Sequence, residues 1–326
     1  MFVELGLLGN LLVLIASLIV LDRASDVTIN NAVKVADISG FGKTTIGFIL
    51  VAFATTLPEL SVSVFAAIGG EGIDIAVGNV LGSNIVNICL ILGLSFLIAS
   101  IKSERRLKIV PTIAKEEVRP LYFGLFIASV VPLTLIYIGY ASRFIGIILI
   151  SIFIYHIYKI SKHGRFKDEG SLGKDRVKLK LYVFLTFIGA IIVVASAYFI
   201  VGSAVYIAEW FGVPQVVLGA TVVAFGTSLP ELANTVKSAF KGHLELALGN
   251  IVGSCFTNIT LILGVALLGS PLTVGAAFTN LIVFSLITNL FLWYFLSNER
   301  ISWREGMVLL FIYSIFLATS FGGYNS

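Results

Sequence analysis

Charged residues are scarce in this chain of 326 residues: Asp, Glu, Lys and Arg together make up 12%, whereas hydrophobic residues make up 58%. A typical soluble domain carries about 25% charged and about 45–50% apolar residues, so this composition excludes a water-soluble globule. Most of the chain must therefore be surrounded by lipid. Motifs of the nucleophile, P-loop or dinucleotide-binding type are also absent, which argues against an enzyme.

Cysteine and histidine are rare too, with two and three residues respectively. Cys89 and Cys255 both fall in apolar stretches, where a thiol usually behaves as a small hydrophobic side chain, so we expect neither a disulfide nor a thiolate metal site. His156, His163 and His243 lie at the edges of loops, where solvated side chains are the simplest interpretation. We expect no resident cofactor.

Apolar stretches recur along the whole chain, and each is close to or above the roughly 20 residues that an α-helix needs to cross the hydrocarbon core of a membrane. The ten expected spans are 4–21, 43–69, 73–100, 120–140, 143–160, 180–209, 215–240, 245–269, 272–297 and 303–321. The first lacks the basic start and the small-residue cleavage site of a signal peptide, so we expect it to be retained. The sequence thus predicts an all-α integral membrane protein with ten transmembrane helices.

The basic residues are distributed unevenly between the two sides of these spans. If the N-terminus is extracellular, all but one of the 22 Lys and Arg residues lie on the cytoplasmic side, the exception being Arg143. Membrane proteins concentrate Lys and Arg in cytoplasmic loops, so we expect a multi-pass protein of the cell membrane with both termini extracellular. The expected partners are the lipid bilayer and small inorganic cations. We expect no nucleic acid and no obligatory protein partner.

Two motifs occur twice in the chain. AFATTLPEL (52–60) and AFGTSLPEL (224–232) agree at seven of nine positions, and AVGNVLGSNIVNICLILGL (76–94) and ALGNIVGSCFTNITLILGV (247–265) agree at eleven of nineteen. The chain is therefore an internal duplication. Residues 1–160 form the first five-helix repeat, 161–178 a cytoplasmic linker loop, and 179–326 the second repeat.

Five crossings in each half have a topological consequence. Because five is odd, the second half enters the membrane from the opposite face, and the two halves form an inverted repeat. Transporters of this kind place the substrate site near the bilayer midplane, between the repeats. The duplicated motifs lie on the second and third helices of each half, so we expect the site there.

Glu59 and Glu231 are the central residues of the duplicated LPEL motifs. A carboxylate inside a transmembrane helix costs about 2.5–3.5 kcal/mol on insertion scales and is functional unless a partner explains it. Neither motif contains a Lys or Arg. Bound cations are the simplest counter-charge, and two protonated, hydrogen-bonded glutamic acids are the structural alternative.

The neighbouring residues strengthen the cation interpretation. Helical spacing places Thr55 and Thr56 on the same face as Glu59, and the second motif repeats this pattern. Pro58 and Pro230 cannot donate a backbone hydrogen bond and clash with the carbonyl four residues earlier, so each should kink its helix and release backbone oxygens.

The third helix of each half carries a stripe of oxygen-bearing residues four apart: Asn79, Ser83 and Asn87 in the first, and Asn250, Ser254 and Asn258 in the second. For Asn79 and Asn250, a role in holding helices together is at least as good an explanation as ligation. Together the two helices of each half offer carboxylates, hydroxyls, amides and carbonyls, which are the ligands of hard cations.

These paired motifs, GTSLPE followed by GN-x-x-GS-x-x-x-N, resemble those of the Ca²⁺/cation antiporter superfamily, and most closely its prokaryotic Na⁺/Ca²⁺ exchanger type. The resemblance covers both repeats and the ten-helix layout. It implies that one cluster binds Ca²⁺ and Na⁺, and that the first helix of each half slides against the other eight. The ligands it implies are Glu59, Thr55, Thr56, Ser83, Asn87 and the carbonyl of Ala52, with Glu231, Thr227, Ser228, Ser254, Asn258 and the carbonyl of Ala224.

Two positions depart from the family pattern. Ala54 stands where a glycine is usual, which could stiffen the first kink slightly. Asn258 stands where prokaryotic exchangers often carry Asp, and K⁺-dependent relatives also use Asp, which argues against K⁺ dependence.

The sequence therefore favours a secondary active antiporter that exchanges Ca²⁺ for Na⁺ by alternating access. The alternative is H⁺/Ca²⁺ exchange, because two carboxylates can be neutralised by one Ca²⁺, two Na⁺ or two protons. The proton-coupled branch usually shows GNATE-like motifs in place of GTSLPE, which favours Na⁺. A cation channel is a weaker alternative, since no pore-loop signature accompanies the repeats.

Overall fold

The computed structural model describes residues 2–39, 56–68, 72–102, 107–108, 115–163, 178–240, 244–297 and 300–322. The first half contains α1 (Phe2–Ser39), α4 (Leu57–Ile68), α5 (Ile73–Ile85), the π-helix η2 (Val86–Leu92), α6 (Gly93–Lys102), β1 (Leu107–Lys108), α7 (Lys115–Ile138), β2 (Tyr140–Ala141) and α8 (Arg143–His163). The second half contains α9 (Leu179–Phe211), α10 (Gln215–Leu218), η4 (Gly219–Val223), α11 (Ala224–Thr227), α12 (Leu229–Phe240), α13 (Leu244–Thr257), η5 (Asn258–Ile262), α14 (Leu263–Gly269), β3 (Leu272–Thr273), α15 (Ala276–Ser297), β4 (Arg300–Ile301) and α16 (Trp303–Gly322).

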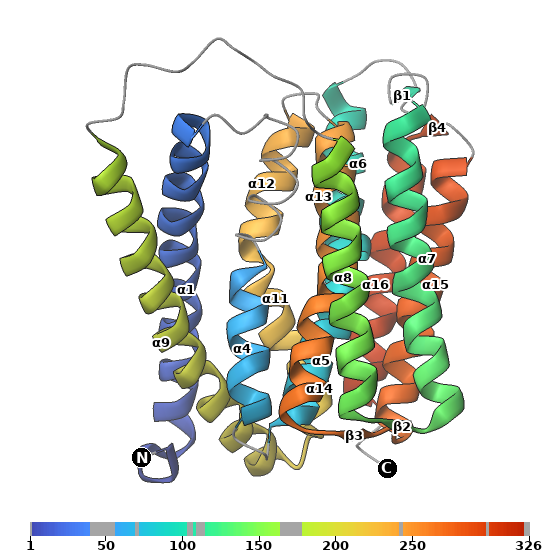
Figure 1. The fold of residues 1–326 in the computed structure, drawn as a ribbon. Helices are drawn as coiled ribbons and strands as arrows, with labels where there is room; N and C mark the ends of the chain where they lie inside the picture. Colours follow the sequence, from blue (N-terminus) through green and yellow to red (C-terminus); the bar gives the residue numbers. More distant parts are fainter. Residues whose placement is uncertain are drawn as a thin grey trace.

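The helices stand roughly side by side as an upright bundle (Figure 1). Six described helical stretches are long and apolar enough to cross a membrane, and a seventh is added if the bent pair α10–α11 and α12 is one span. Residues 57–67 and 122–138 form shorter apolar helices. The all-α membrane class is therefore confirmed, whereas the count of ten spans stays a prediction.

The described helix boundaries follow the expected spans closely, except at the N-terminus. The sequence predicts a first span ending near residue 21, whereas the apolar stretch that could cross a membrane runs to Thr28 and the helix α1 continues beyond it to Ser39. Gly6 interrupts the start of α1 with a φ of 64°, a left-handed conformation that glycine adopts readily. The side-chain amide of Asn10 donates hydrogen bonds to the carbonyls of Phe2 and Gly6, at 2.6 and 2.8 Å, and satisfies backbone groups at the break.

Two long helices, α1 and α9, form a pair at one side of the bundle (Figure 1). They pack against each other along much of their length, and α9 also contacts α4. Small residues let them approach closely: a Cβ added at Gly189 of α9 would lie 2.3 Å from the Thr28 hydroxyl of α1. Since lipid tails are as apolar as Leu, such close packing is a main source of helix association in membranes.

Two short β-ladders tie the halves together at opposite ends of the bundle (Figure 1). β1 pairs antiparallel with β4, with Leu107 opposite Ile301, and β2 pairs antiparallel with β3, with Tyr140 opposite Thr273. Each ladder takes one strand from each half of the chain. The sequence analysis did not anticipate either ladder, because two-residue strands in loops leave no hydrophobic periodicity.

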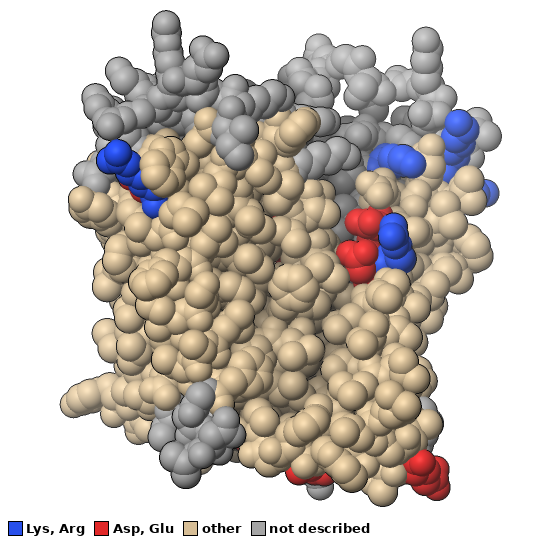
Figure 2. Space-filling view, turned by 180° about the vertical axis from the view of Figure 1, so that it is seen from behind, with Lys and Arg blue, Asp and Glu red and all other residues tan. Residues whose placement is uncertain are grey.

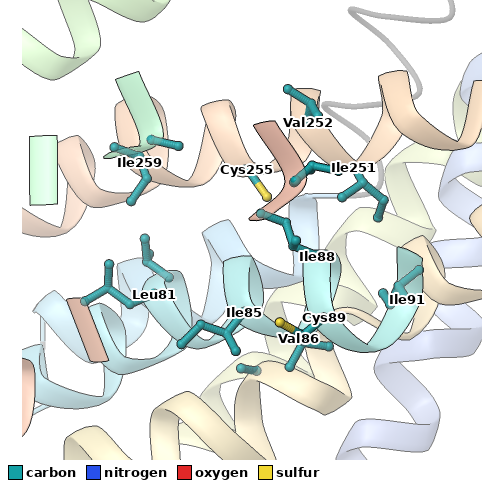
Figure 3. Close-up of a cluster of buried hydrophobic side chains, with 14 of the residues drawn as sticks. Leu81, Ile85, Val86, Ile88, Cys89, Ile91, Ile251, Val252, Cys255 and Ile259 are labelled. Carbon is teal, nitrogen blue, oxygen red and sulfur yellow. The ribbon is translucent and has the colours of Figure 1, made fainter. Parts of the chain in front are cut away.

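The apolar core lies where α5 and η2 cross α13 and η5, and Figure 3 shows this crossing. Cys89 and Cys255 belong to the cluster, both are buried, and both are free thiols, as expected. The Cys255 side chain points toward Ile88 of the other half (Figure 3). The packing fixes how the third helices of the two halves sit against each other, and so positions the polar residues that they carry.

Glycines make the close contacts between the core and the last helix of each half. A Cβ added at Gly306 of α16 would lie 2.7 Å from the carbonyl oxygen of Gly93 in α6. A Cβ added at Gly146 of α8 would lie 2.7 Å from the carbonyl oxygen of Gly264 in α14. The same contact therefore occurs twice, each time between the last helix of one half and the third helix of the other, and it requires residues without side chains.

The outer surface is largely apolar. Many large hydrophobic side chains of α1, α7, α8, α9, α15 and α16 are exposed, as they would be toward lipid. On the face shown in Figure 2, the Lys and Arg side chains lie in the upper half, and the middle of the molecule is almost free of charge. This pattern fits a multi-pass membrane protein. Which end faces the cytoplasm stays a prediction.

The glycine contact between α6 and α16 yields a test of packing. Replacing Gly306 with Ala would force a methyl group against the backbone of Gly93, and overpacking typically costs about 1–3 kcal/mol. We expect G306A to lower the free energy of unfolding by about this amount, measured by thermal unfolding of the purified protein in detergent. G275A is the matched control, because a Cβ there meets nothing within 4 Å. Equal stability of the two variants would contradict this account.

Candidate ion-binding site

Two buried carboxylates mark the candidate site. Glu59 lies in the first turn of α4 and Glu231 in the first turn of α12, and both are 0% exposed. The two first turns meet, because the hydroxyl of Ser228, three residues before Glu231, donates a hydrogen bond to Glu59. Among the described residues no Lys or Arg side chain is buried. The protein therefore holds two acidic groups in its interior without a basic residue of comparable burial.

A break in the helix precedes Glu231. In the second half, the segment 215–227 and the segment 229–240 are bent by 47°. Ser228 at the break has φ −86° and ψ 8°, outside the helical region. Pro230 follows two residues later and cannot donate to the carbonyl of Gly226, so the kink predicted there is confirmed. The residues of the corresponding first kink, including Ala54, lie outside the described residues.

The break allows one half of the chain to reach the other. The hydroxyl of Ser228 donates a hydrogen bond to Oε1 of Glu59 at 3.1 Å. Helical spacing placed Ser228 on the face of Glu231, but in the structure its hydroxyl serves the carboxylate of the opposite repeat. The reason is the non-helical conformation of Ser228, which turns its side chain away from the axis of α12.

Asn79 ties three segments together around Glu59. Its Oδ1 accepts a hydrogen bond from the Thr227 hydroxyl at 3.0 Å. Its amide nitrogen lies 3.4 Å from both the Glu59 carbonyl oxygen and the Ser63 hydroxyl. In the second half, the Asn250 amide donates to the Thr235 hydroxyl at 3.2 Å. Both outer asparagines thus hold helices together, the alternative that the sequence left open for them.

Two π-helical segments carry the inner asparagines. Asn87 lies in η2 and Asn258 begins η5, and both are buried. Wide π turns inside α-helices are frequent at functional sites, because they leave backbone groups and side chains displaced from the regular ladder. The segments cross between repeats, since η2 contacts α12 and η5 contacts α4. Each carboxylate-bearing helix therefore packs against the asparagine-bearing segment of the other half.

Several buried oxygens of this region have no hydrogen-bond partner among the described residues. They are Oε2 of Glu59, Oγ of Ser83, Oδ1 of Asn87, Oγ of Ser254 and Oδ1 of Asn258. A buried polar atom without a partner costs about 1–3 kcal/mol, so a concentration of such atoms calls for an explanation. All five atoms can accept a hydrogen bond or bind a cation, although the two serine hydroxyls can also donate, and all belong to residues that the duplicated motifs single out.

Ten of the twelve residues proposed from the sequence can be placed. Glu59, Thr56, Ser83, Asn87, Glu231, Thr227, Ser228, Ser254, Asn258 and Ala224 are all buried. Ala52 and Thr55 lie outside the described residues. The carbonyl of Ala224 accepts a hydrogen bond from the Ser228 N–H at 3.1 Å, and the Thr227 hydroxyl lies 3.3 Å from the same oxygen. Its oxygen is therefore engaged within the kink in this conformation.

The sequence analysis missed Asn84. This buried side chain accepts a hydrogen bond from the Asn258 amide at 3.0 Å, and its own amide nitrogen lies 3.5 Å from the Cys255 carbonyl oxygen. The search for polar residues that occur at matched positions of both repeats missed Asn84, because the matching residue of the second repeat is Cys255. A polar residue present in one repeat alone was the available signal.

The arrangement has a clear chemical character. Two carboxylates are surrounded by hydroxyl and amide oxygens, and neither a histidine nor a thiolate joins them among the described residues. Hard cations prefer oxygen ligands of this type, whereas soft transition metals prefer sulfur and nitrogen. A multi-pass helical bundle with a buried cluster of this kind belongs to the class of membrane cation transporters.

Comparisons with known proteins identify the family. Residues 9–160 and 181–322 match the family model of the sodium/calcium exchanger protein. The sodium/calcium exchanger MaX1 of Methanosarcina acetivorans is 31% identical, over 96% of this chain and 98% of the relative. The inner membrane protein YrbG of Escherichia coli is 33% identical over 69% of each chain. This chain belongs to the sodium/calcium exchanger family, within the Ca²⁺/cation antiporter superfamily.

Solved structures agree with this assignment. The sodium-calcium exchanger NCX_Mj is 28% identical, with a TM-score of 0.68 over 95% of this chain and 98% of that one. The H⁺/Ca²⁺ exchanger CAX shares the fold, with a TM-score of 0.77 over 96% of this chain and 87% of that one, at 20% identity. The relatives are transporters, and this protein is a transporter and not an enzyme.

The role of Asn79 can be tested against its counterpart in the second half. Replacing Asn79 with Leu removes three hydrogen bonds, one of them from Thr227 of the second half, whereas replacing Asn250 with Leu removes the one described for it. A buried hydrogen bond is worth about 1 kcal/mol, so we expect N79L to cost about 2–3 kcal/mol of unfolding free energy and N250L about 1 kcal/mol. Thermal unfolding in detergent compares them. A larger loss in N250L would refute the bridging role of Asn79.

Proposed function

We propose that this protein is a secondary active antiporter that exchanges Ca²⁺ for Na⁺ at a single site near the bilayer midplane. The cations bind between α4, α12, η2 and η5. The proposed ligands are the twelve residues given by the sequence, including Thr55 and Ala52, which lie outside the described residues. Ca²⁺ and Na⁺ are transported substrates, and we propose no resident cofactor.

One observation carries the proposal: both carboxylates are buried, and the same motifs hold buried hydroxyl and amide oxygens that have no hydrogen-bond partner among the described residues. Glu59 has one oxygen bonded to Ser228 and the other without a partner among the described residues. The two carboxylates carry charges of the same sign, and these repel each other unless something positive lies between them. A cation resolves this conflict, and a buried hydrophobic core could not.

Charge balance explains why binding of one ion would exclude the other. Two buried carboxylates are neutralised by one Ca²⁺ or by two Na⁺, and an unneutralised pair is expensive in a low-dielectric interior. A site that must hold either occupant in order to cross the membrane barrier couples the two fluxes. Exchange then follows without any separate coupling device.

The inverted repeat supports alternating access. The matched pairs α4 and α12, α5 and α13, α7 and α15, and α8 and α16 run in opposite directions through the bundle (Figure 1). Such symmetry allows the same chain to adopt two related conformations that open the site to opposite sides. We therefore propose ten spans in two inverted five-helix repeats, with both termini extracellular and the basic loops cytoplasmic.

The pair α1 and α9 is the proposed moving part. These helices contact each other more extensively than they contact the core, and their contacts with the core include the site helices α4, α11 and α12. A Cβ at Gly226, beside the kink of the second half, would overlap Leu18 of α1 at 2.2 Å. Movement of α1 would therefore be felt directly at the kink that precedes Glu231.

Proton coupling is the second candidate function. Carboxylates can be neutralised by protons as well as by Na⁺, and the fold is shared with the H⁺/Ca²⁺ exchanger CAX. Identity favours Na⁺, since NCX_Mj is 28% identical and CAX is 20% identical. A cation channel has no such support.

Transport in liposomes separates these candidates. Purified protein would be reconstituted with internal Na⁺ and diluted into Na⁺-free buffer containing Ca²⁺, alongside Na⁺-free vesicles that carry a pH gradient. We expect Ca²⁺ uptake that requires internal Na⁺. Uptake driven by the pH gradient alone would replace Na⁺ coupling by proton coupling, and uptake without any counter-ion would indicate a channel.

The carboxylates provide the matching mutational prediction. Removing one partner of a buried ion pair costs about 3–5 kcal/mol, so E59Q and E231Q should each lower Ca²⁺ flux at least about a hundredfold. Both variants keep the size of the side chain and should retain the unfolding temperature within a few degrees. E209Q, at the exposed end of α9, is the control and should transport normally. Normal flux in both site variants would disprove the assignment of the site.

A further inference from the structure

Asn84 breaks the symmetry of the duplicated third helix. The repeat matches Asn79 with Asn250 and Asn87 with Asn258, but it matches Asn84 with Cys255. Asn84 is 0% exposed and lies at the crossing where α5 meets α13 and η5. A buried amide that one repeat carries and the other replaces by a thiol is not needed for the shared scaffold. We therefore look for a role of Asn84 that exists in the first repeat and not in the second.

A chain of two hydrogen bonds runs through this residue. The amide nitrogen of Asn84 is directed at the carbonyl oxygen of Cys255, at 3.5 Å. The Oδ1 atom of Asn84 accepts a hydrogen bond from the amide nitrogen of Asn258, at 3.0 Å. The chain thus begins at a backbone carbonyl of α13 and ends at the first residue of η5.

The chemistry of these groups determines which way each amide faces. A backbone carbonyl can accept but cannot donate, so Asn84 must present its nitrogen to Cys255 and its oxygen to Asn258. Asn258 must then present its nitrogen to Asn84. Its own oxygen is left without a hydrogen-bond partner and is buried. The orientation of Asn258 is therefore fixed by a backbone group two steps away.

We propose that Asn84 is a positioning residue, which directs the Oδ1 oxygen of Asn258 to the transported cation. The proposal rests on the proposed function, in which Asn258 is a ligand. Without Asn84, the amide of Asn258 can turn over and present its N–H groups to a positive ion. An outer residue that orients a metal ligand typically contributes a factor of about 10–100 to metal affinity.

The same hydrogen bond keeps position 258 neutral. An aspartate there would offer two acceptor oxygens and no donor, so one of them would face Oδ1 of Asn84. Turning Asn84 over would place its oxygen against the Cys255 carbonyl instead. The pair therefore selects an amide at position 258 and holds the cluster at two negative charges, those of Glu59 and Glu231.

Direct Ca²⁺ binding tests this role without requiring transport. The dissociation constant for Ca²⁺ would be measured by equilibrium dialysis on the purified full chain in detergent, for wild type, N84L, N258A and the double variant. We expect N84L to weaken binding about tenfold. We expect the double variant to bind no more weakly than N258A, because without the Asn258 amide there is nothing to orient.

A matched control separates orientation from general damage to the core. Asn289 of α15 is a buried amide, 1% exposed and without a hydrogen-bond partner in the described structure, and N289L makes the same chemical change away from the Asn84–Asn258 bond. We expect N289L to bind Ca²⁺ like the wild type. Thermal unfolding of all variants establishes that each is folded at the temperature of the measurement.

The outcomes are distinct. Unchanged Ca²⁺ binding in N84L, or losses that add in the double variant, would overturn the positioning role while leaving the proposed function in place. Absence of Ca²⁺ binding by the wild type would overturn the proposed function and this assignment together. The assignment is supported if N84L binds Ca²⁺ more weakly than the wild type and the double variant binds it no more weakly than N258A.

Discussion

The burial of two carboxylates in an otherwise apolar bundle is the constraint on which the rest of this structure depends. Each acidic group in a membrane interior costs several kcal/mol, and no buried Lys or Arg among the described residues offsets that cost. Several oxygens of the surrounding hydroxyls and amides have no hydrogen-bond partner among the described residues. The cation that we propose to bind there would offset this cost.

The irregular parts of the helices are what make this cluster possible. A regular helix directs its carbonyls along its axis, whereas the kink at Ser228 and the π-helical segments η2 and η5 displace backbone and side chains from that pattern. The kink lets Ser228 reach Glu59 in the other half. Elsewhere glycine contacts bring the helices close, so that irregular segments are held by a tightly packed frame.

The sequence predicted the class, most helix boundaries and the central residues, because duplication and hydrophobicity are visible in one chain. It could not predict which half each side chain serves. The hydrogen bond from Ser228 to Glu59 depends on a non-helical turn, and the bond from Asn258 to Asn84 depends on how two helices cross. Repeat comparison also hides asymmetry, so Asn84 was passed over. The sequence did not predict the full length of α1, because the second part of this helix is polar and hydrophobicity does not reveal it.

The two β-ladders have a mechanical consequence. One joins the loop strand β1 of the first half to β4 of the second, and the other joins β2 of the first to β3 of the second, at opposite ends of the bundle. The two halves are therefore joined to each other at both ends of the bundle. The boundary between the two repeats is therefore not where we propose that the protein divides into moving parts. The boundary at which we propose movement lies instead between the α1 and α9 pair and the rest of the bundle.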